Sequence, residues 1–245
     1  MRKDRPVTGS DGRVLMVFAH PDDETLLAGA LIPKLLSDGN EVHLLCVAPG
    51  DDADRVSRME RAAAEFGISR VVSLRFAASG ASNPPAEGPR MPTLASAPES
   101  AVAHLIEGRI AEIAPSIVIT HSPTGDYGHP DHIACHRATA MAVDATSRPL
   151  ELYALAWPSF ALSVNRRLGR VFGAFGDREA TAERPENLPV THVHDVSRYL
   201  PHRKRAARHY SNEIARGPLP MRLLEAAPVA LQRPVLGKAR LSRIR

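Results

Sequence analysis

The chain has 245 residues, of which 44% are hydrophobic and 24% are charged, and its formal net charge is +4. This composition is typical of a globular protein near the upper size of one domain, and it excludes a low-complexity chain. No apolar run approaches the ~20 residues that cross a bilayer, and no signal-peptide core precedes His20. We therefore expect a soluble, cytoplasmic protein with no transmembrane segment. Its two isolated cysteines, Cys46 and Cys135, make no disulfide framework.

Short apolar runs that alternate with helical patterns predict the body of the fold. The predicted strands cover 14–18, 41–47, 71–74, 116–120 and 152–156, and the predicted helices cover 25–37, 51–66, 99–114 and 130–145. Pro33 stands inside the first helical pattern, where a kink is expected. Residues 77–98 have no period and form the longest predicted internal loop. Strands that alternate with helices predict an α/β fold, with helices on both faces of a parallel sheet.

The rest of the chain is interpreted as an extension of the same domain. A single domain covers 1–245, with a core over about 13–157 and an extension over 158–245. A strand near 190–194, a helix over 197–215 and a partly helical basic tail from 218 are expected there. Lys and Arg dominate from Arg203 onward, but Tyr210 is the one aromatic residue among them, so base stacking by nucleic acid is unsupported. The basic surface is interpreted as solvated.

Two polar stretches of the same design follow the first and the fourth predicted strands. One runs from Phe18 to Thr25 and the other from Thr120 to His132, and each contains His and Asp beside Pro. In the common strand order 3-2-1-4-5 the order reverses between these two strands, and ligands bind at that reversal. We therefore expect one composite site. Neither stretch has the glycine pattern of a phosphate loop or the GxSxG turn of a serine hydrolase.

The histidines and carboxylates of these loops predict a metal site. Imidazole and carboxylate suit Zn²⁺, and a catalytic zinc usually has three protein ligands and an open position. The candidate ligands are His20, Asp23 and His132. Fe²⁺ also suits two histidines and one carboxylate. His132 and His136 have the i, i+4 spacing of helical zinc sites and are an alternative, and Asp23 could instead be a helix cap.

The other polar residues of the loops indicate hydrolysis of a carbonyl compound such as an amide. Asp22 stands beside the metal ligands and can take a proton from a metal-bound water. His129 and Tyr127 are left to face the substrate, where they can stabilise an oxyanion and protonate a departing amine. His121 closes the fourth predicted strand and is a candidate supporting residue.

At these residues the sequence resembles the PIG-L/LmbE-type zinc-dependent N-deacetylases. The stretches Ala19–Glu24 and His129–His132 match the two signatures of that family, and the order of elements between 14 and 156 is similar to its core. The resemblance implies a Rossmann-like three-layer sandwich with a mostly parallel sheet and a C-terminal extension. It also implies zinc ligation by His20, Asp23 and His132, with Asp22 as general base and His129 as general acid.

The resemblance assigns further roles outside the metal ligands. Asp131 resembles the carboxylate that holds His129 protonated, and Tyr127 a tyrosine that stabilises the tetrahedral intermediate. Arg58 resembles a basic residue near the sugar-binding edge, and His209 a late histidine near the substrate. The implied substrate is an N-acyl, usually N-acetyl, amide of an amino sugar or glycoconjugate. Because such enzymes commonly assemble, a homo-oligomer is also expected.

One departure from the family bears on the substrate. The mycothiol-type members carry an acidic residue before a Ser-Gly pair, whereas Ala77 and Ala78 precede Ser79 here. That particular substrate is therefore in doubt. The alternatives are an amidase acting on a thiol conjugate or a natural-product N-acyl group, and a non-catalytic binding protein of the same fold.

Overall fold

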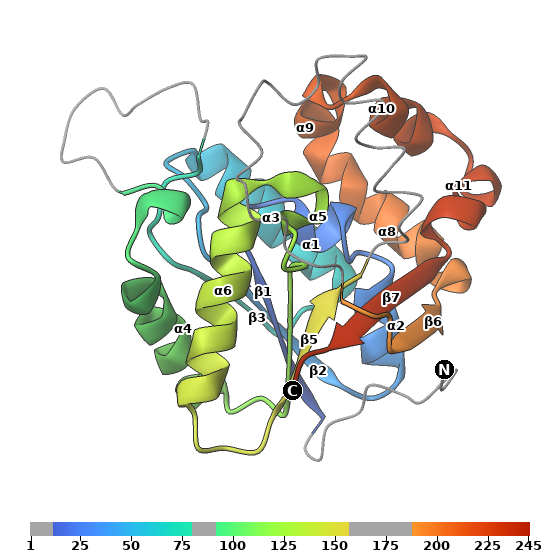
Figure 1. The fold of residues 1–245 in the computed structure, drawn as a ribbon. Helices are drawn as coiled ribbons and strands as arrows, with labels where there is room; N and C mark the ends of the chain where they lie inside the picture. Colours follow the sequence, from blue (N-terminus) through green and yellow to red (C-terminus); the bar gives the residue numbers. More distant parts are fainter. Residues whose placement is uncertain (1–11, 80–91, 157–187) are drawn as a thin grey trace.

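The protein is described by a computed structural model that covers residues 12–79, 92–156 and 188–245 (Figure 1). It contains a seven-stranded sheet of order β3-β2-β1-β4-β5-β7-β6. The first five strands in that order pair in parallel, and β7 pairs antiparallel with both β5 and β6. The strands are β1 (Arg13–Phe18), β2 (Glu41–Cys46), β3 (Arg70–Ser73), β4 (Ile117–Thr120), β5 (Glu151–Leu155), β6 (His192–Asp195) and β7 (Lys238–Arg243). The predicted reversal of strand order between β1 and β4 is confirmed.

Strand β1 is the middle one of the five parallel strands, and almost every one of its side chains is apolar. Alternate residues of a strand face opposite sides of a sheet, and a strand buried on both faces is a continuous apolar run. Met16 and Phe18 accordingly contribute to one core cluster, while Leu15 and Val17 contribute to the other, and all four are fully buried.

Helices cover both faces of the sheet, as Figure 1 shows. One face packs against α2 (Leu31–Ser37), α3 (Ala53–Phe66) and α8 (Leu200–Ala207), and the other against α4 (Glu99–Ile113) and α6 (Pro130–Ala145). The predicted three-layer α/β sandwich is therefore confirmed. Helix α3 begins where the Asp52 carboxylate accepts the backbone N–H groups of Asp54 and Arg55, and it ends at Gly67 with φ +84°.

The first helical pattern is two helices, and the kink predicted at Pro33 is wrong. Helix α1 (Asp23–Leu26) stops, and α2 starts at Leu31. Pro33 is the third residue of α2 and lies in its first turn. Backbone N–H groups there have no intrahelical partner, so the N–H that proline lacks costs the helix no hydrogen bond. In the long loop, Ala77 bridges to Thr93, and a short 3₁₀ helix η1 (Leu94–Ser96) follows; residues 80–91 lie outside the described part.

The C-terminal extension returns to the sheet. The late helical pattern is η2 (Ser197–Tyr199), α8, η3 (Arg208–Tyr210) and α9 (Ser211–Arg216), and the tail continues as α10 (Leu219–Ala226) and α11 (Val229–Leu236). The tail then forms β7, which the sequence did not predict. Only Leu241 and Ser242 of β7 are buried, so its basic residues hid the strand pattern. Most of the segment 159–189 lies outside the described residues.

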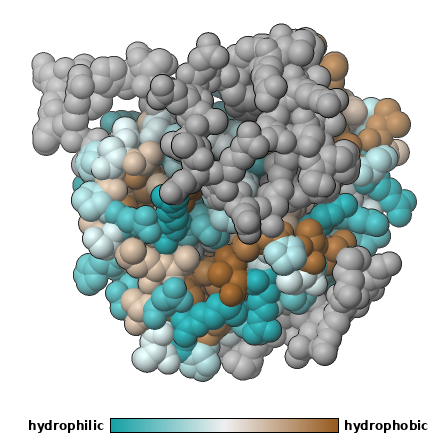
Figure 2. Space-filling model, in the orientation of Figure 1, coloured by the Kyte–Doolittle hydropathy of each residue, from teal (hydrophilic) through white to brown (hydrophobic). Residues whose placement is uncertain are grey.

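The surface of the extension is partly apolar. On the face shown in Figure 2, hydrophobic side chains gather over α10 and α11, where Leu223 and Leu231 are 62% and 67% exposed. None of the helices within the described ranges combines the length and the apolar character that crossing a membrane requires.

Candidate functional site

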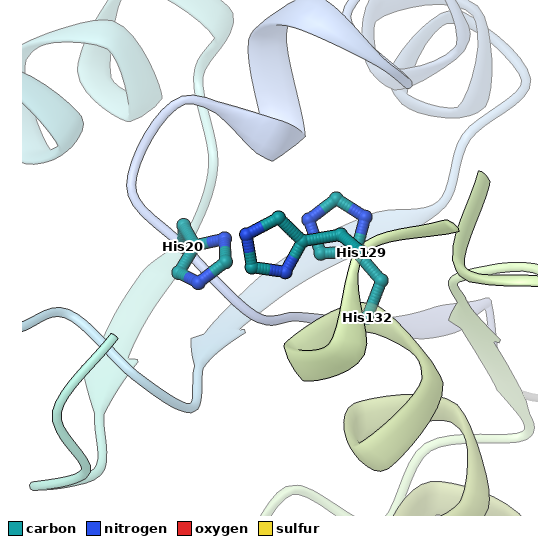
Figure 3. A group of neighbouring side chains, drawn as sticks. All are labelled: His20, His129 and His132. Atoms are coloured by element: carbon teal, nitrogen blue, oxygen red, sulfur yellow. The ribbon is translucent and has the colours of Figure 1, made fainter. Parts of the chain in front are cut away.

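The two predicted loops lie side by side at the carboxyl ends of β1 and β4. These strands pair in parallel, with Val17 opposite Thr120, so the turns that follow them meet at one edge of the sheet. His20 comes from the turn after β1, whereas His129 and His132 come from the start of α6, and the three rings face one another (Figure 3). One ring nitrogen from each lies within 4.8 Å of one from each of the others.

Asp23 stands between the two loops. Its Oδ1 lies 3.4 Å from Nε2 of His132, and its Oδ2 lies 3.6 Å from Nδ1 of His20. Asp23 is not a side-chain helix cap, because its carboxylate accepts the backbone N–H of His20 at 2.8 Å. Although burial opposes it, His132 and His121 hold the pKa of Asp23 well below its usual range. The structure thus brings the three predicted ligands together as neighbours.

His132 has the geometry of a metal ligand. Its Nδ1 lies 2.9 Å from Oδ2 of Asp126, which places the ring proton on Nδ1 and leaves the Nε2 lone pair facing Asp23. Within the described part of the chain, this buried Nε2 has no hydrogen-bond partner. A buried lone pair that faces a carboxylate is unfavourable unless a cation lies between them. Burial also lowers the pKa of His132, which favours the neutral, metal-binding ring. The donor set therefore fits a divalent metal.

Asp126 is a functional candidate that the sequence analysis missed. Its Oδ2 bonds Nδ1 of both His121, at 2.6 Å, and His132, at 2.9 Å. It lies in α5 (Gly125–Gly128) at φ +63° and ψ −69°, a strained position for a residue other than glycine. In metal sites, the ring N–H of a ligand histidine that does not face the metal commonly donates to a carboxylate, as Nδ1 of His132 does to Asp126. Asp126 stands in the second polar stretch, but a single Asp after Gly is also typical of an ordinary turn.

His121 is held at both ring nitrogens. Its Nε2 accepts the backbone N–H of Ala19 at 2.9 Å, and its Nδ1 bonds Asp126. Burial lowers the pKa of His121, and Asp126 and Asp23 more than offset this to raise it; because Nε2 accepts a hydrogen bond, we assign the neutral ring. An occupied Nε2 favours a supporting role over direct ligation. The alternative ligand His136 instead bonds the His121 carbonyl through Nδ1 at 2.8 Å.

The substitution Asp126→Asn is expected to weaken metal binding by about 10- to 100-fold, because a neutral amide cannot orient both imidazoles as the carboxylate does. Competition with a fluorescent chelator measures this affinity. Asp144→Asn makes the same change at an exposed position at the far end of α6 and is expected to bind metal as the unmodified chain does. An unchanged affinity in Asp126→Asn would remove Asp126 from the site.

Asp22 is held in a strained turn beside the candidate ligands. It has φ +110° and precedes α1, where its side chain makes no capping bond. Its Oδ2 accepts a hydrogen bond from Nη2 of Arg55 at 3.1 Å. Burial and the neighbouring Asp23 raise the pKa of Asp22 to about 7, against the opposing effect of Arg55. A carboxylate with such a pKa is suited to general base catalysis near neutral pH.

The structure corrects the role expected of Asp131. Its carboxylate bonds Nε2 of His20 at 2.9 Å, and Ser79 and the Ala95 amide also donate to it. Burial raises the pKa of Asp131, but the hydrogen bonds from His20 and Ser79 lower it to about 2. Among the described residues, no hydrogen bond joins this carboxylate to the His129 ring. Within the described ranges, the hydrogen bond that the His129 ring makes is the one it accepts at Nδ1 from the backbone N–H of Asp131, at 3.1 Å. Burial and the nearby rings of His20 and His132 lower the pKa of His129 to about 3.

Tyr127 lies beside His129 and His132. Its ring centre lies 5.2 Å from that of His132 and 5.9 Å from that of His129, and the residue is 39% exposed. Burial of the phenol and the carboxylate of Asp23 raise the pKa of Tyr127 well above its usual value. The hydroxyl therefore stays protonated and able to donate, as the predicted role of Tyr127 requires.

The two predicted substrate-binding residues are placed differently. Arg58 donates to Asp54 and to Glu213 on α9, at 2.6 and 2.8 Å. One helical turn earlier, Arg55 reaches Asp22, a contact that the sequence did not predict because the resemblance points to Arg58. His209 lowers the pKa of Glu65, after the larger effect of Arg205. Among the described residues, no hydrogen bond or ion pair joins His209 to the two loops.

Known proteins resemble this chain in both sequence and fold. A deacetylase of Rhodococcus opacus, named for 1D-myo-inositol 2-acetamido-2-deoxy-α-D-glucopyranoside, is 34% identical over 56% of this chain. The chain spans 54% of that relative's length. A deacetylase of the same name from Tsukamurella paurometabola is 32% identical over 68% of each chain. The crystal structure of the A40926 pseudoaglycone deacetylase Dbv21 matches with a TM-score of 0.66 and 20% identity, covering 96% of this chain and 98% of Dbv21.

The structural match, at 20% identity, shows only that the fold is shared, because one fold can have many activities. The sequence match is more specific. The family model described as PIG-L, GlcNAc-PI de-N-acetylase, matches residues 15–143, which contain both polar loops and more than half of the chain. The resemblance first seen in two short signatures thus extends over most of the predicted core, and the chain belongs to the PIG-L family.

Proposed function

We propose that this chain is a metal-dependent N-deacetylase that hydrolyses an N-acetyl amide on an amino-sugar or glycoconjugate substrate. The observation that carries the proposal is Nε2 of His132, which faces Asp23 and has no hydrogen-bond partner among the described residues. A second carboxylate, Asp22, stands beside the candidate ligands and bonds Arg55 instead. The names of the relatives support the substrate class, since the two sequence relatives are named as deacetylases of an acetamido sugar.

We assign His20, Asp23 and His132 as the ligands of Zn²⁺, with Fe²⁺ suited to the same donors. A metal bound there would polarise the amide carbonyl and make a water molecule more acidic. His20 would bind through Nδ1, because its Nε2 is held by Asp131. This arrangement gives Asp131 a supporting role on a ligand rather than on His129.

The remaining residues divide the proton transfers among them. Asp22 takes a proton from the attacking water. His129 accepts the Asp131 amide at Nδ1, so its proton is on Nε2, from which the neutral ring can donate to the developing oxyanion together with the Tyr127 hydroxyl. The departing amine then needs a proton, and Asp22 has just gained one. We therefore assign that last transfer to Asp22, and oxyanion stabilisation to His129 and Tyr127.

The substitution Arg55→Gln is expected to move the acidic limb of the kcat/KM profile to higher pH. The base must be ionised to act, and the Arg55 cation lowers the pKa of Asp22, so its removal raises that pKa. The limb is measured from initial rates across pH 5–9. Arg61→Gln removes an exposed guanidinium of the same helix and should leave the limb in place. A limb that does not move in Arg55→Gln would contradict Asp22 as the base.

The proposed activity is tested by amine release from a panel of N-acyl compounds with Zn²⁺ or Fe²⁺ supplied. The panel includes N-acetylglucosamine conjugates, an N-acyl thiol conjugate and an N-acyl glycopeptide. Faster release from the sugar conjugates supports the proposal, whereas preference for either other compound moves the chain to that amidase class. No release from any compound by metal-loaded protein would favour a binding protein. Assembly into a homo-oligomer stays a prediction, which the molecular mass in solution tests.

A further inference from the structure

We infer that the short C-terminal segment Arg208–Arg216 positions the turn that carries Asp22, and that Tyr210 and Glu213 are positioning residues for the reaction. This inference rests on the proposed function. The segment comprises η3 and α9, almost two hundred residues along the chain from the turn. It reaches the turn through a series of hydrogen bonds and, separately, through an ion pair between Glu213 and Arg55.

The first connection passes through Glu24, which the proposed mechanism does not use. Tyr210 and Glu24 are both fully buried. The Tyr210 hydroxyl donates to Oε1 of Glu24 at 2.7 Å, and Thr25 Oγ1 donates to the same oxygen at 2.6 Å. The other oxygen, Oε2, accepts the backbone N–H of Asp22 at 3.1 Å. A buried carboxyl group is costly unless its oxygens are bonded, and here those bonds tie the extension to the backbone of Asp22.

The second connection passes through two arginines of α3. Glu213 Oε1 accepts a hydrogen bond from Nη2 of Arg58 at 2.8 Å and lies 3.9 Å from Nε of Arg55. Nη2 of Arg55 in turn donates to the Pro21 carbonyl at 3.0 Å and to the Asp22 carboxylate at 3.1 Å. The first connection therefore holds the backbone of Asp22, and the second holds its side chain.

The turn needs this support because its backbone is strained. Asp22 has φ +110°, a conformation that residues other than glycine keep only where their surroundings enforce it. Two backbone bonds from Thr25 and Leu26 to the Asp22 carbonyl, at 3.0 and 2.7 Å, fix one side of the peptide. The N–H side depends on Glu24, and Glu24 depends on Tyr210. A carboxylate that must meet a water molecule loses rate when it is misplaced by about an ångström.

The test compares Tyr210→Phe with Tyr199→Phe, which makes the same change at another buried tyrosine of the extension, whose hydroxyl contacts Arg198. The assay is amine release from p-nitrophenyl N-acetyl-β-D-glucosaminide by the zinc-loaded full chain. Tyr210→Phe is expected to lower kcat about tenfold or more with KM nearly unchanged. In the same variant, hydrogen–deuterium exchange should become faster in a peptide covering 20–27. Tyr199→Phe should change neither quantity.

A second variant, Glu213→Gln, tests the other connection and keeps the test decisive if Tyr210→Phe does not fold. It is expected to lower kcat several-fold, and restoring the charge with Glu213→Asp should recover part of the loss. Wild-type kcat and wild-type exchange at 20–27 in both variants would overturn the inference. If the unmodified chain releases no amine, the proposed function fails, while the exchange comparison still decides whether the segment holds the turn.

Discussion

Asp22→Asn is expected to lower kcat/KM by about 10²- to 10⁴-fold, the usual contribution of a general base. The amide has nearly the shape of the carboxylate but cannot take a proton from water. The Asp22 carboxylate accepts a hydrogen bond from Arg55, while its backbone N–H donates to Glu24. Its φ of +110° suits Asn as well as Asp. The fold and the metal site should therefore be preserved. Metal content by elemental analysis and amine release are measured on the same preparation.

The stability of this variant provides a second, independent check. Burial raises the pKa of Asp22 from its ordinary value of 3.8 to about 7, so its ionisation costs folding free energy. That cost is absent below the ordinary pKa, grows as the pH rises toward about 7 and is complete above it. Asp22→Asn removes the cost and should unfold at a higher temperature than the unmodified chain at pH 8. Asp38→Asn, at a carboxylate paired with Lys34, should change neither activity nor Tm appreciably. An Asp22→Asn enzyme that keeps more than half of the activity would refute the proposed mechanism.

The parts of the fold that the sequence predicted are those where local pattern and tertiary environment agree. Strand β1 is apolar because both of its faces are buried, and this alone identifies it as central. The end of α3 at Gly67 follows from a left-handed cap that glycine adopts without strain. Strand β7 could not be found in this way, because three of its six residues are basic and its partners lie at a great distance along the chain.

The candidate site, too, could be predicted from the sequence only in part. Its metal-ligand candidates follow directly from two short motifs and the strand order, which together place them at one edge of the sheet. The connections among the side chains do not follow from spacing. The carboxylate of Asp131 bonds His20 rather than His129, and Arg55 rather than Arg58 reaches Asp22. Which of two side chains reaches a partner depends on its rotamer and on the direction in which its helix position points. The number of residues between two positions determines neither.

His132→Ala is expected to abolish stoichiometric metal binding and to lower activity by at least about 10³-fold. The ring supplies the unpartnered Nε2 that faces Asp23, and metal catalysis of this kind is worth several kcal/mol. Treating the unmodified chain with a chelator should cause the same loss, and added Zn²⁺ should reverse it there but not in the variant. Metal content and amine release are followed together, because activity alone would not separate lost metal from misplaced substrate.

His136→Ala is the matched control for that experiment. His136 is also a buried histidine, one helical turn further along α6, and its position tests the alternative ligand pair that the i, i+4 spacing allows. Its Nδ1 bonds the His121 carbonyl, so its loss should disturb the end of β4 while the metal stays bound. If His136→Ala loses the metal and His132→Ala retains it, the ligand assignment is wrong and the site must be rebuilt around α6. If only His132→Ala loses the metal, the two loops share one cation. That result is expected because Nε2 of His132, from one loop, faces the carboxylate of Asp23, from the other.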